Sequence, residues 1–105
     1  MEQVIELVSY TLVEGATEQD IVTATEQSHR FIATLPGFLY RSLSHDSTTN
    51  RWTDIVYWQT MDDAKNAGEQ FMACPDCQPL MGLIEQPSLV MQHSVIDKHH
   101  LTQFV

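Results

Sequence analysis

Four ionisable side chains lie in segments that otherwise have the composition of β-strands: Glu6, Arg41, Asp54 and His93. A carboxylate beside a histidine fixes the tautomer of the imidazole and increases its proton affinity, which prepares a general base. An arginine close by would hold an anionic or phenolate oxygen in its fork of N–H donors. If the strands align these residues in one row, the sequence predicts an acid–base site with His93 as the base and Arg41 as the oxyanion partner.

A structural role is the alternative for the same four side chains. They would then form an ion-pair network that compensates buried charges, or they would lie exposed at the rim of a sheet. Alternation along the strands favours a common face for Glu6 and Asp54, and it leaves the faces of Arg41 and His93 open.

Large side chains in the same segments are candidates for the walls of a ligand site. The predicted lining residues are Tyr10, Trp52, Val56, Trp58 and Met91. Aromatic walls suit a flat, apolar ligand and exclude water. The alternative is that these side chains only form the core of a dimer interface.

The cysteines and the remaining histidines do not form a site in this interpretation. Cys74-Pro75-Asp76-Cys77 is a single CxxC motif, and it lacks the second pair that a structural zinc site needs. It separates two helical pieces, whereas a thioredoxin-like motif follows a strand at the start of a helix. His99 and His100 are too few to hold a metal ion. We therefore predict incidental thiols and no bound metal or other cofactor.

Composition restricts the class of protein and its partners. The 105 residues carry 14 acidic and 5 basic side chains, for a formal net charge of −9. Such a surface repels nucleic acid and anionic membrane, so neither is an expected partner. No apolar run approaches the ~20 residues of a membrane helix, and the start Met1-Glu2-Gln3 lacks the basic region of a signal peptide. We expect one domain over residues 1–105 and a cytoplasmic location.

Periodicity and capping residues predict the elements that position these side chains. Strands are predicted over residues 3–12, 38–45, 52–59 and 88–97. A helix over 18–34 begins with the capping residue Thr17, and its His29 is expected on the solvent side. A second helix begins after Thr60 and is interrupted at residues 74–76. Turn residues at 46–50 predict that the second and third strands form a hairpin.

This order of elements favours an α+β fold. The arrangement βαββαβ predicts a ferredoxin-like, four-stranded antiparallel sheet with strand order 4-1-3-2 and the helices on one face. The other face is then uncovered, although the strands carry apolar residues on both faces. We place the two tryptophans on that uncovered face, which is unusual for a monomer. The sequence therefore predicts that the chain pairs with itself as a homodimer.

Five segments carry a resemblance to a known family: Leu35-Pro36-Gly37-Phe38, residues 52–58, Asp63-Ala64, Phe71-Met72 and Met91-Gln92-His93. Over nearly its whole length the chain resembles the antibiotic biosynthesis monooxygenase-like proteins of the dimeric α/β-barrel superfamily. The resemblance implies that two sheets pair face to face into a barrel with a ligand pocket inside. It also implies a small aromatic ligand, such as a quinol or a polyketide-like compound. No histidine lies in the second helix, where the resemblance would place a haem ligand.

The resemblance leaves three functions open. The first is a cofactor-independent monooxygenase, in which the carbanion or phenolate of the substrate itself reduces dioxygen while the protein deprotonates it and keeps water out. The second is a non-catalytic ligand-binding or stress-associated dimeric barrel. The third is a barrel that is packed solid. A cavity reached by both Asp54 and His93 would favour the enzyme.

Overall fold

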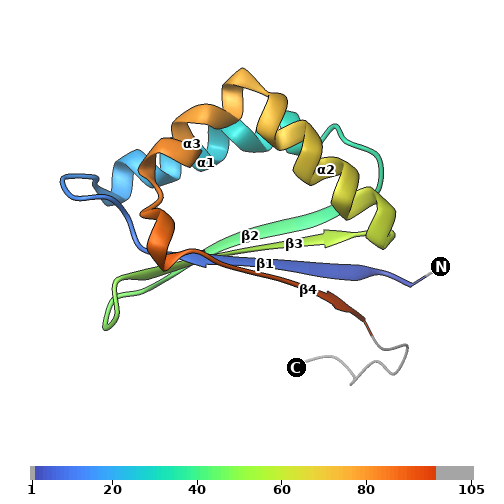
Figure 1. Cartoon of the computed structure of the whole chain (residues 1–105), viewed down its shortest axis with the longest axis horizontal. Coiled ribbons are helices and arrows are strands. Elements are labelled where there is room, and N and C mark those ends of the chain that lie inside the picture. The colour runs from blue at the N-terminus through green and yellow to red at the C-terminus, as the bar shows by residue number, and fades with distance from the viewer. Residues whose placement is uncertain (1, 97–105) are drawn as a thin grey trace, which may run out of the picture.

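The computed structural model describes residues 2–96, which form one sheet with helices on a single side (Figure 1). Its strands are β1 (Val4–Tyr10), β2 (Phe38–Asp46), β3 (Arg51–Trp58) and β4 (Val90–Val95). Its helices are α1 (Glu18–Ile32), α2 (Met61–Ala73) and α3 (Gln78–Leu83), with the 3₁₀ turns η1 (Pro75–Cys77) and η2 (Gln86–Ser88). All strand pairs are antiparallel in the order β2-β3-β1-β4. Read from the opposite edge, this is the predicted order 4-1-3-2, so the α+β ferredoxin-like prediction is confirmed.

Side-chain caps fix the starts of the two main helices, as predicted. Thr17 Oγ1 accepts a hydrogen bond from the backbone N–H of Asp20, and the Asp20 carboxylate accepts one from the N–H of Thr17. Thr60 accepts in the same way from the N–H of Asp63. These bonds satisfy N–H groups that have no partner within the helix. After α1 the chain turns at Gly37, where φ is +81° and the Asp63 side chain leaves no room for a Cβ atom.

The largest boundary difference concerns the last strand. Strand β4 runs from Val90 to Val95, not over the predicted residues 88–97, because Gln86–Ser88 form η2 instead. The hydroxyl of Ser88 accepts a hydrogen bond from the N–H of Thr11, which ties this turn to the end of β1. Residue 97 and the pair His99–His100 lie outside the described residues.

The sheet face that carries the two tryptophans is the face covered by the helices. Tyr10, Trp52 and Trp58 are 0%, 4% and 1% exposed, and all three belong to the core beneath the helices. The prediction that they lie on the uncovered face is therefore wrong. Alternation shows which residues share a face, but it does not show which face the helices cover, because β3 has large apolar side chains on both.

Cross-strand register brings three of the four predicted charged residues into one row. On the helix side Arg41 pairs with Val56, Val56 with Glu6, and Glu6 with His93. Asp54 lies two residues before Val56 on β3, in the next row on the same face, where it pairs with Val8. The predicted row is thus wrong at one position, since Val56 stands where Asp54 was expected. All four charged side chains nevertheless share one face.

The core is divided into two clusters. One contains Trp58 and packs against α2, and the other contains Tyr10 and packs against α1 and α3. Phe71 of α2 contacts both clusters. A gap in the packing lies between them, directly above the charged residues of the sheet.

His29 of α1 is half-buried, with its ring edge-on to Phe38 at a centroid distance of 5.5 Å. Its predicted position on the solvent side of α1 is therefore wrong.

Among the described residues, no helix combines the length and the apolar character that crossing a bilayer requires.

Candidate functional site

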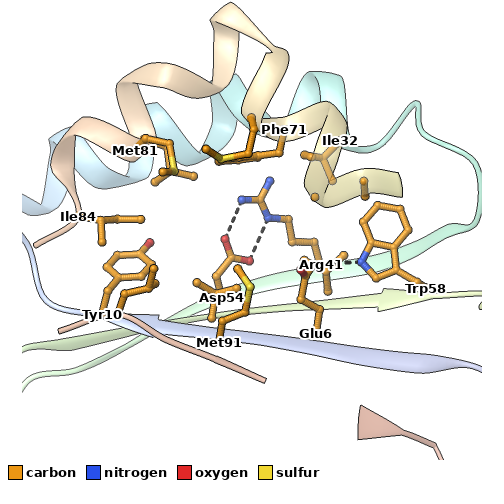
Figure 2. Close-up of a pocket in the computed structure, with 17 residues that line it drawn as sticks. Glu6, Tyr10, Ile32, Arg41, Asp54, Trp58, Phe71, Met81, Ile84 and Met91 are labelled. Carbon is orange, nitrogen blue, oxygen red and sulfur yellow. Dashed lines mark hydrogen bonds and ion pairs between the residues drawn. The ribbon is translucent and has the colours of Figure 1, made fainter. Parts of the chain in front are cut away.

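A cavity of about 360 Å³ lies between the helices and the sheet (Figure 2). Seven of the nine residues predicted for the site line it: Glu6, Tyr10, Arg41, Asp54, Val56, Trp58 and Met91. The other two do not. Trp52 lies farther along β3, where it stacks on His45, and His93 stands behind Glu6. The cavity therefore lies within one chain, on the helix side of the sheet, and not against the uncovered face.

Arg41 and Asp54 form a buried, two-point ion pair on the floor of this cavity. The Arg41 Nε–H donates to Asp54 Oδ1 at 3.0 Å and Nη2–H donates to Oδ2 at 2.7 Å. Their side chains are only 6% and 7% exposed. Burial by itself would lower the pKa of Arg41, but the hydrogen bonds and charge of Asp54 raise it above its ordinary value. Arg41 therefore stays charged on the floor of a largely apolar space.

The third nitrogen of Arg41 is held from the helix side. Its Nη1–H donates to Ser28 Oγ at 3.1 Å, and that hydroxyl donates in turn to the carbonyl of Thr25 at 2.8 Å. Figure 2 shows the guanidinium reaching up from the sheet between Asp54 and the helices. Helix α1 and strands β2 and β3 together fix its position.

A second polar group on the floor is centred on Glu6. Its Oε1 accepts from the indole N–H of Trp58 at 3.2 Å, and its Oε2 lies 3.2 Å from Nε2 of His93. This contact directs Nε2 of His93 at the carboxylate of Glu6, and His93 is not among the residues that line the cavity. Of these two residues, Glu6 is the one that lines the cavity. Glu6 faces the cavity and His93 holds Glu6 in place from the outer side.

Tyr10 brings a buried hydroxyl to the same floor. Its side chain is fully buried, and among residues 2–96 its hydroxyl has no hydrogen-bond partner. Burial and the negative charge of Asp54 raise the pKa of Tyr10, and the smaller opposing effects of Arg41 and Thr25 do not cancel this rise. Tyr10 therefore remains a protonated donor beside the ion pair.

Helices α2 and α3 form an apolar roof over the cavity. Phe71 and Met81 lie above the ion pair (Figure 2). Met72 of α2 and Met91 of β4 also line the cavity but are 62% and 56% exposed, so they mark its mouth. Sequence reasoning predicted none of the roof residues of α2 and α3 as site residues. Their spacing predicts the apolar face of a helix. Side chains that pack in a core and side chains that line a cavity have the same spacing, so the sequence does not distinguish them.

The CxxC motif lies outside this cavity. Cys74 and Cys77 are buried free thiols at the junction between α2 and α3. Burial, followed by the hydrogen bond and charge of Cys74, raises the pKa of Cys77 to about 12, so its thiol is unreactive at neutral pH. Within the described part of the chain, no three His, Cys, Asp or Glu side chains cluster in a way that could hold a metal ion.

Comparison with known proteins identifies the fold. No protein-family model matches the chain, and no curated protein has a matching sequence. Among solved structures, SnoaB, a cofactor-independent oxygenase from Streptomyces nogalater, superposes with a TM-score of 0.73 at 18% identity and covers 98% of this chain and 100% of its own. A protein from Bordetella bronchiseptica classed as an antibiotic biosynthesis monooxygenase gives 0.67 at 20% identity, covering 90% and 96%.

A third structure of the same shape has a different activity. Hydroxynitrile lyase from Passiflora edulis superposes with a TM-score of 0.68 at 12% identity, covering 94% of this chain and 97% of its own. The resemblance to monooxygenase-like proteins is thus confirmed for the fold. Since one fold hosts several chemistries, the activity must be argued from the cavity itself.

Proposed function

We propose that the cavity binds a small, flat, mainly apolar molecule with an acidic C–H or O–H group, and that the protein oxidises it with dioxygen. The observation that carries this proposal is the buried Arg41–Asp54 ion pair on the floor of an apolar cavity. A volume of about 360 Å³ lies in the range of small-molecule sites. Apolar walls with a few fixed polar groups are typical of such sites.

The charged residues have separate roles in this proposal. Arg41 directs its free N–H groups at the ligand oxygen and stabilises the anion that forms when the ligand loses a proton. Asp54 positions Arg41, and Tyr10 donates a further hydrogen bond. Glu6 is the acceptor of the proton, and His93 orients Glu6. A carboxylate is a weak base, so the ligand must be acidic, and its anion must be stabilised by Arg41.

The proposed reaction needs no electrons beyond those of the substrate. Loss of a proton from a CH₂ group flanked by aromatic rings gives a carbanion, which forms a C–O bond with dioxygen. The O–O bond then breaks as the second hydrogen of that carbon leaves as a proton. Carbon ends as C=O, and the other oxygen atom leaves as water with the two protons. All four electrons that reduce dioxygen come from the carbon.

Oxygen uptake with a panel of anthrones and hydroquinones tests this proposal. We expect one dioxygen consumed per ketone or quinone formed from a CH₂-type substrate. Arg41→Met should abolish turnover, Glu6→Gln should lower kcat, and His93→Gln should lower it less because His93 only positions Glu6. An exposed arginine on α1 provides the control, since Arg30→Met should leave turnover unchanged.

The outcome separates the enzyme from a non-catalytic binding protein. Binding of panel members without oxygen uptake would favour the binding protein. Binding is measured by quenching of tryptophan fluorescence in a Trp52→Phe variant, in which Trp58 is the remaining tryptophan. Failure of every member to bind would contradict both. Binding with equal turnover in wild type and Arg41→Met would contradict the role given to the ion pair.

We further propose that two copies pair through the uncovered sheet face. Ile5, Leu7, Ile55 and Tyr57 are only partly buried there, and Tyr40 is 59% exposed with its ring 5.9 Å from that of Tyr57. Contiguous apolar surface of this kind is typical of an interface. Sedimentation at low micromolar concentration should give twice 12.0 kDa, whereas a stable monomer would contradict the pairing.

A further inference from the structure

Glu6 and Arg41 stand on opposite sides of Val56 on the floor of the cavity. Arg41 of β2 and Glu6 of β1 both pair with Val56 of β3, so the three residues form one row. Neighbouring strands lie about 4.8 Å apart, which separates the Cα atoms of Glu6 and Arg41 by about 9.5 Å. All three side chains line the cavity, and Figure 2 shows the two charged ones rising from the sheet. A ligand above Val56 therefore has a carboxylate on one side and a guanidinium on the other.

The Glu6 carboxylate also has a connection to solvent. Its Oε2 lies 3.2 Å from Nε2 of His93, and the side chain of His93 is 29% exposed against 12% for that of Glu6. An imidazole can pass protons at neutral pH. A proton that Glu6 takes up inside the cavity can therefore exchange with water by way of His93, which leaves the carboxylate free to act again.

We propose that this row of residues gives the protein a second activity that needs no dioxygen, namely proton transfer beside the carbonyl group of a small aromatic ketone. Glu6 removes a proton from the carbon next to the carbonyl. The electron pair of that C–H bond forms a C=C bond, and the π pair of C=O moves to the oxygen. Arg41 stabilises the resulting enolate oxygen through its N–H groups. Return of a proton from Glu6 to carbon restores the ketone, so no electrons are gained or lost.

The inference rests on the proposed function for the place of the ligand and for its first proton transfer. It goes further because the enolate returns to a ketone instead of being oxidised. A carboxylate base opposite hydrogen-bond donors to the substrate oxygen is the arrangement of ketone isomerases. Tyr10 is a further protonated donor that lines the same cavity.

Deuterium exchange into 2-indanone without oxygen tests this activity. Each CH₂ group of this flat ketone lies between the carbonyl and the aromatic ring and is therefore acidic, and proton NMR in D₂O follows the loss of its signal. We expect exchange at least about 100-fold faster with the protein than with acetate at the same concentration. Glu6→Gln should remove this acceleration. Glu69→Gln should keep it, because Glu69 is exposed on α2 and does not line the cavity.

A second variant tests the same site with all of its charged residues in place. Gly68 lines the cavity, and a Cβ atom there meets no atom within 4 Å, so Gly68→Leu fills the cavity. Exchange should then fall to the rate with acetate, whereas Gly82→Leu, outside the cavity, should exchange like the wild type.

The outcomes distinguish this inference from the proposed oxidation. Exchange into 2-indanone without oxygen uptake from any panel member would contradict the oxidation alone. Oxygen uptake without exchange would overturn the ketone activity alone. The ketone activity is also refuted if Glu6→Gln exchanges as fast as Glu69→Gln, or if Gly68→Leu exchanges as fast as Gly82→Leu.

Discussion

Replacing Arg41 by methionine should destabilise the protein strongly, because it leaves the Asp54 carboxylate without its partner inside the protein. Both side chains are less than one-tenth exposed, and two short hydrogen bonds join them. Removing one member of a buried ion pair costs about 3–5 kcal/mol. An exposed ion pair would cost at most about 1 kcal/mol. Burial thus decides which magnitude applies.

Urea unfolding measures this cost. With a slope of about 2 kcal/mol per molar urea for a chain of this size, a loss of 3–5 kcal/mol lowers the midpoint by about 1.5–2.5 M. The exposed replacement Arg30→Met should change the free energy of unfolding by no more than about 0.5 kcal/mol. A double variant, Arg41→Met with Asp54→Leu, should recover most of the loss, since apolar residues of similar volume replace a buried pair at little cost.

The double variant is the decisive part of this experiment. If the effects of the two single replacements simply add in the double variant, the coupling between Arg41 and Asp54 is zero. The pair would then not be the buried interaction described here. The same conclusion would follow if Arg41→Met were no more destabilising than Arg30→Met.

Three further predictions concern other parts of the chain. Gly68→Leu should fill the cavity and weaken the binding of 1-naphthol, a small flat aromatic probe, at least about tenfold in calorimetry. Gly82→Leu is the control and should not weaken it, because Gly82 lies outside the cavity and is equally free of close contacts. Stability should fall as pH rises from about 9, where the unfolded thiol of Cys77 ionises, to about 12, where the folded one does. The fall is at most about 1.4 kcal/mol per pH unit, and Cys77→Ala should reduce it in urea titrations. Replacing Cys74 and Cys77 together by alanine should cost about 1–3 kcal/mol and leave naphthol binding intact; a lost dithiol redox couple would contradict this.

The elements and their order could be predicted from the sequence because local chemistry determines them. Thr17 and Thr60 cap the helices through bonds to residues three positions away. Cys74 is extended and Pro75 follows, so the break after α2 is also local. Short connections between these elements then leave few topologies, and the ferredoxin-like one is observed.

The location of the cavity could not be predicted in the same way. Strand β3 has Trp52, Val56 and Trp58 on one face and Ile55 and Tyr57 on the other, so both faces qualify as buried. The helices cover the first face, with Trp58 and Val56 in one cluster with α2. Which face the helices cover depends on contacts between residues far apart in the sequence. The cavity is a gap in the same packing, so its position depends on those contacts as well.

The face of Arg41 follows from the register of one hairpin, and this register links the turn to the proposed chemistry. Asp46 pairs with Arg51 across the turn, and counting back along both strands places Arg41 opposite Val56 on the helix side. A slip of one residue would move Arg41 to the uncovered face, because side chains alternate. Asn50 specifies the turn, with a φ of +56° and a 2.9 Å hydrogen bond to His45.

A bulge farther along β2 completes the site. Register shifts between Phe38 and Tyr40, so Phe38 also faces the helices, where it packs edge-on against Trp58 at 5.8 Å. Without that extra residue, Leu39 would lie opposite Trp58 and Phe38 would turn to the uncovered face. Trp58 in turn donates to Glu6. The turn thus places the guanidinium of Arg41 in the cavity, and the bulge supports the Trp58 ring that binds the carboxylate of Glu6. Composition and alternation do not contain this information about the turn and the bulge, so they left the face of Arg41 open.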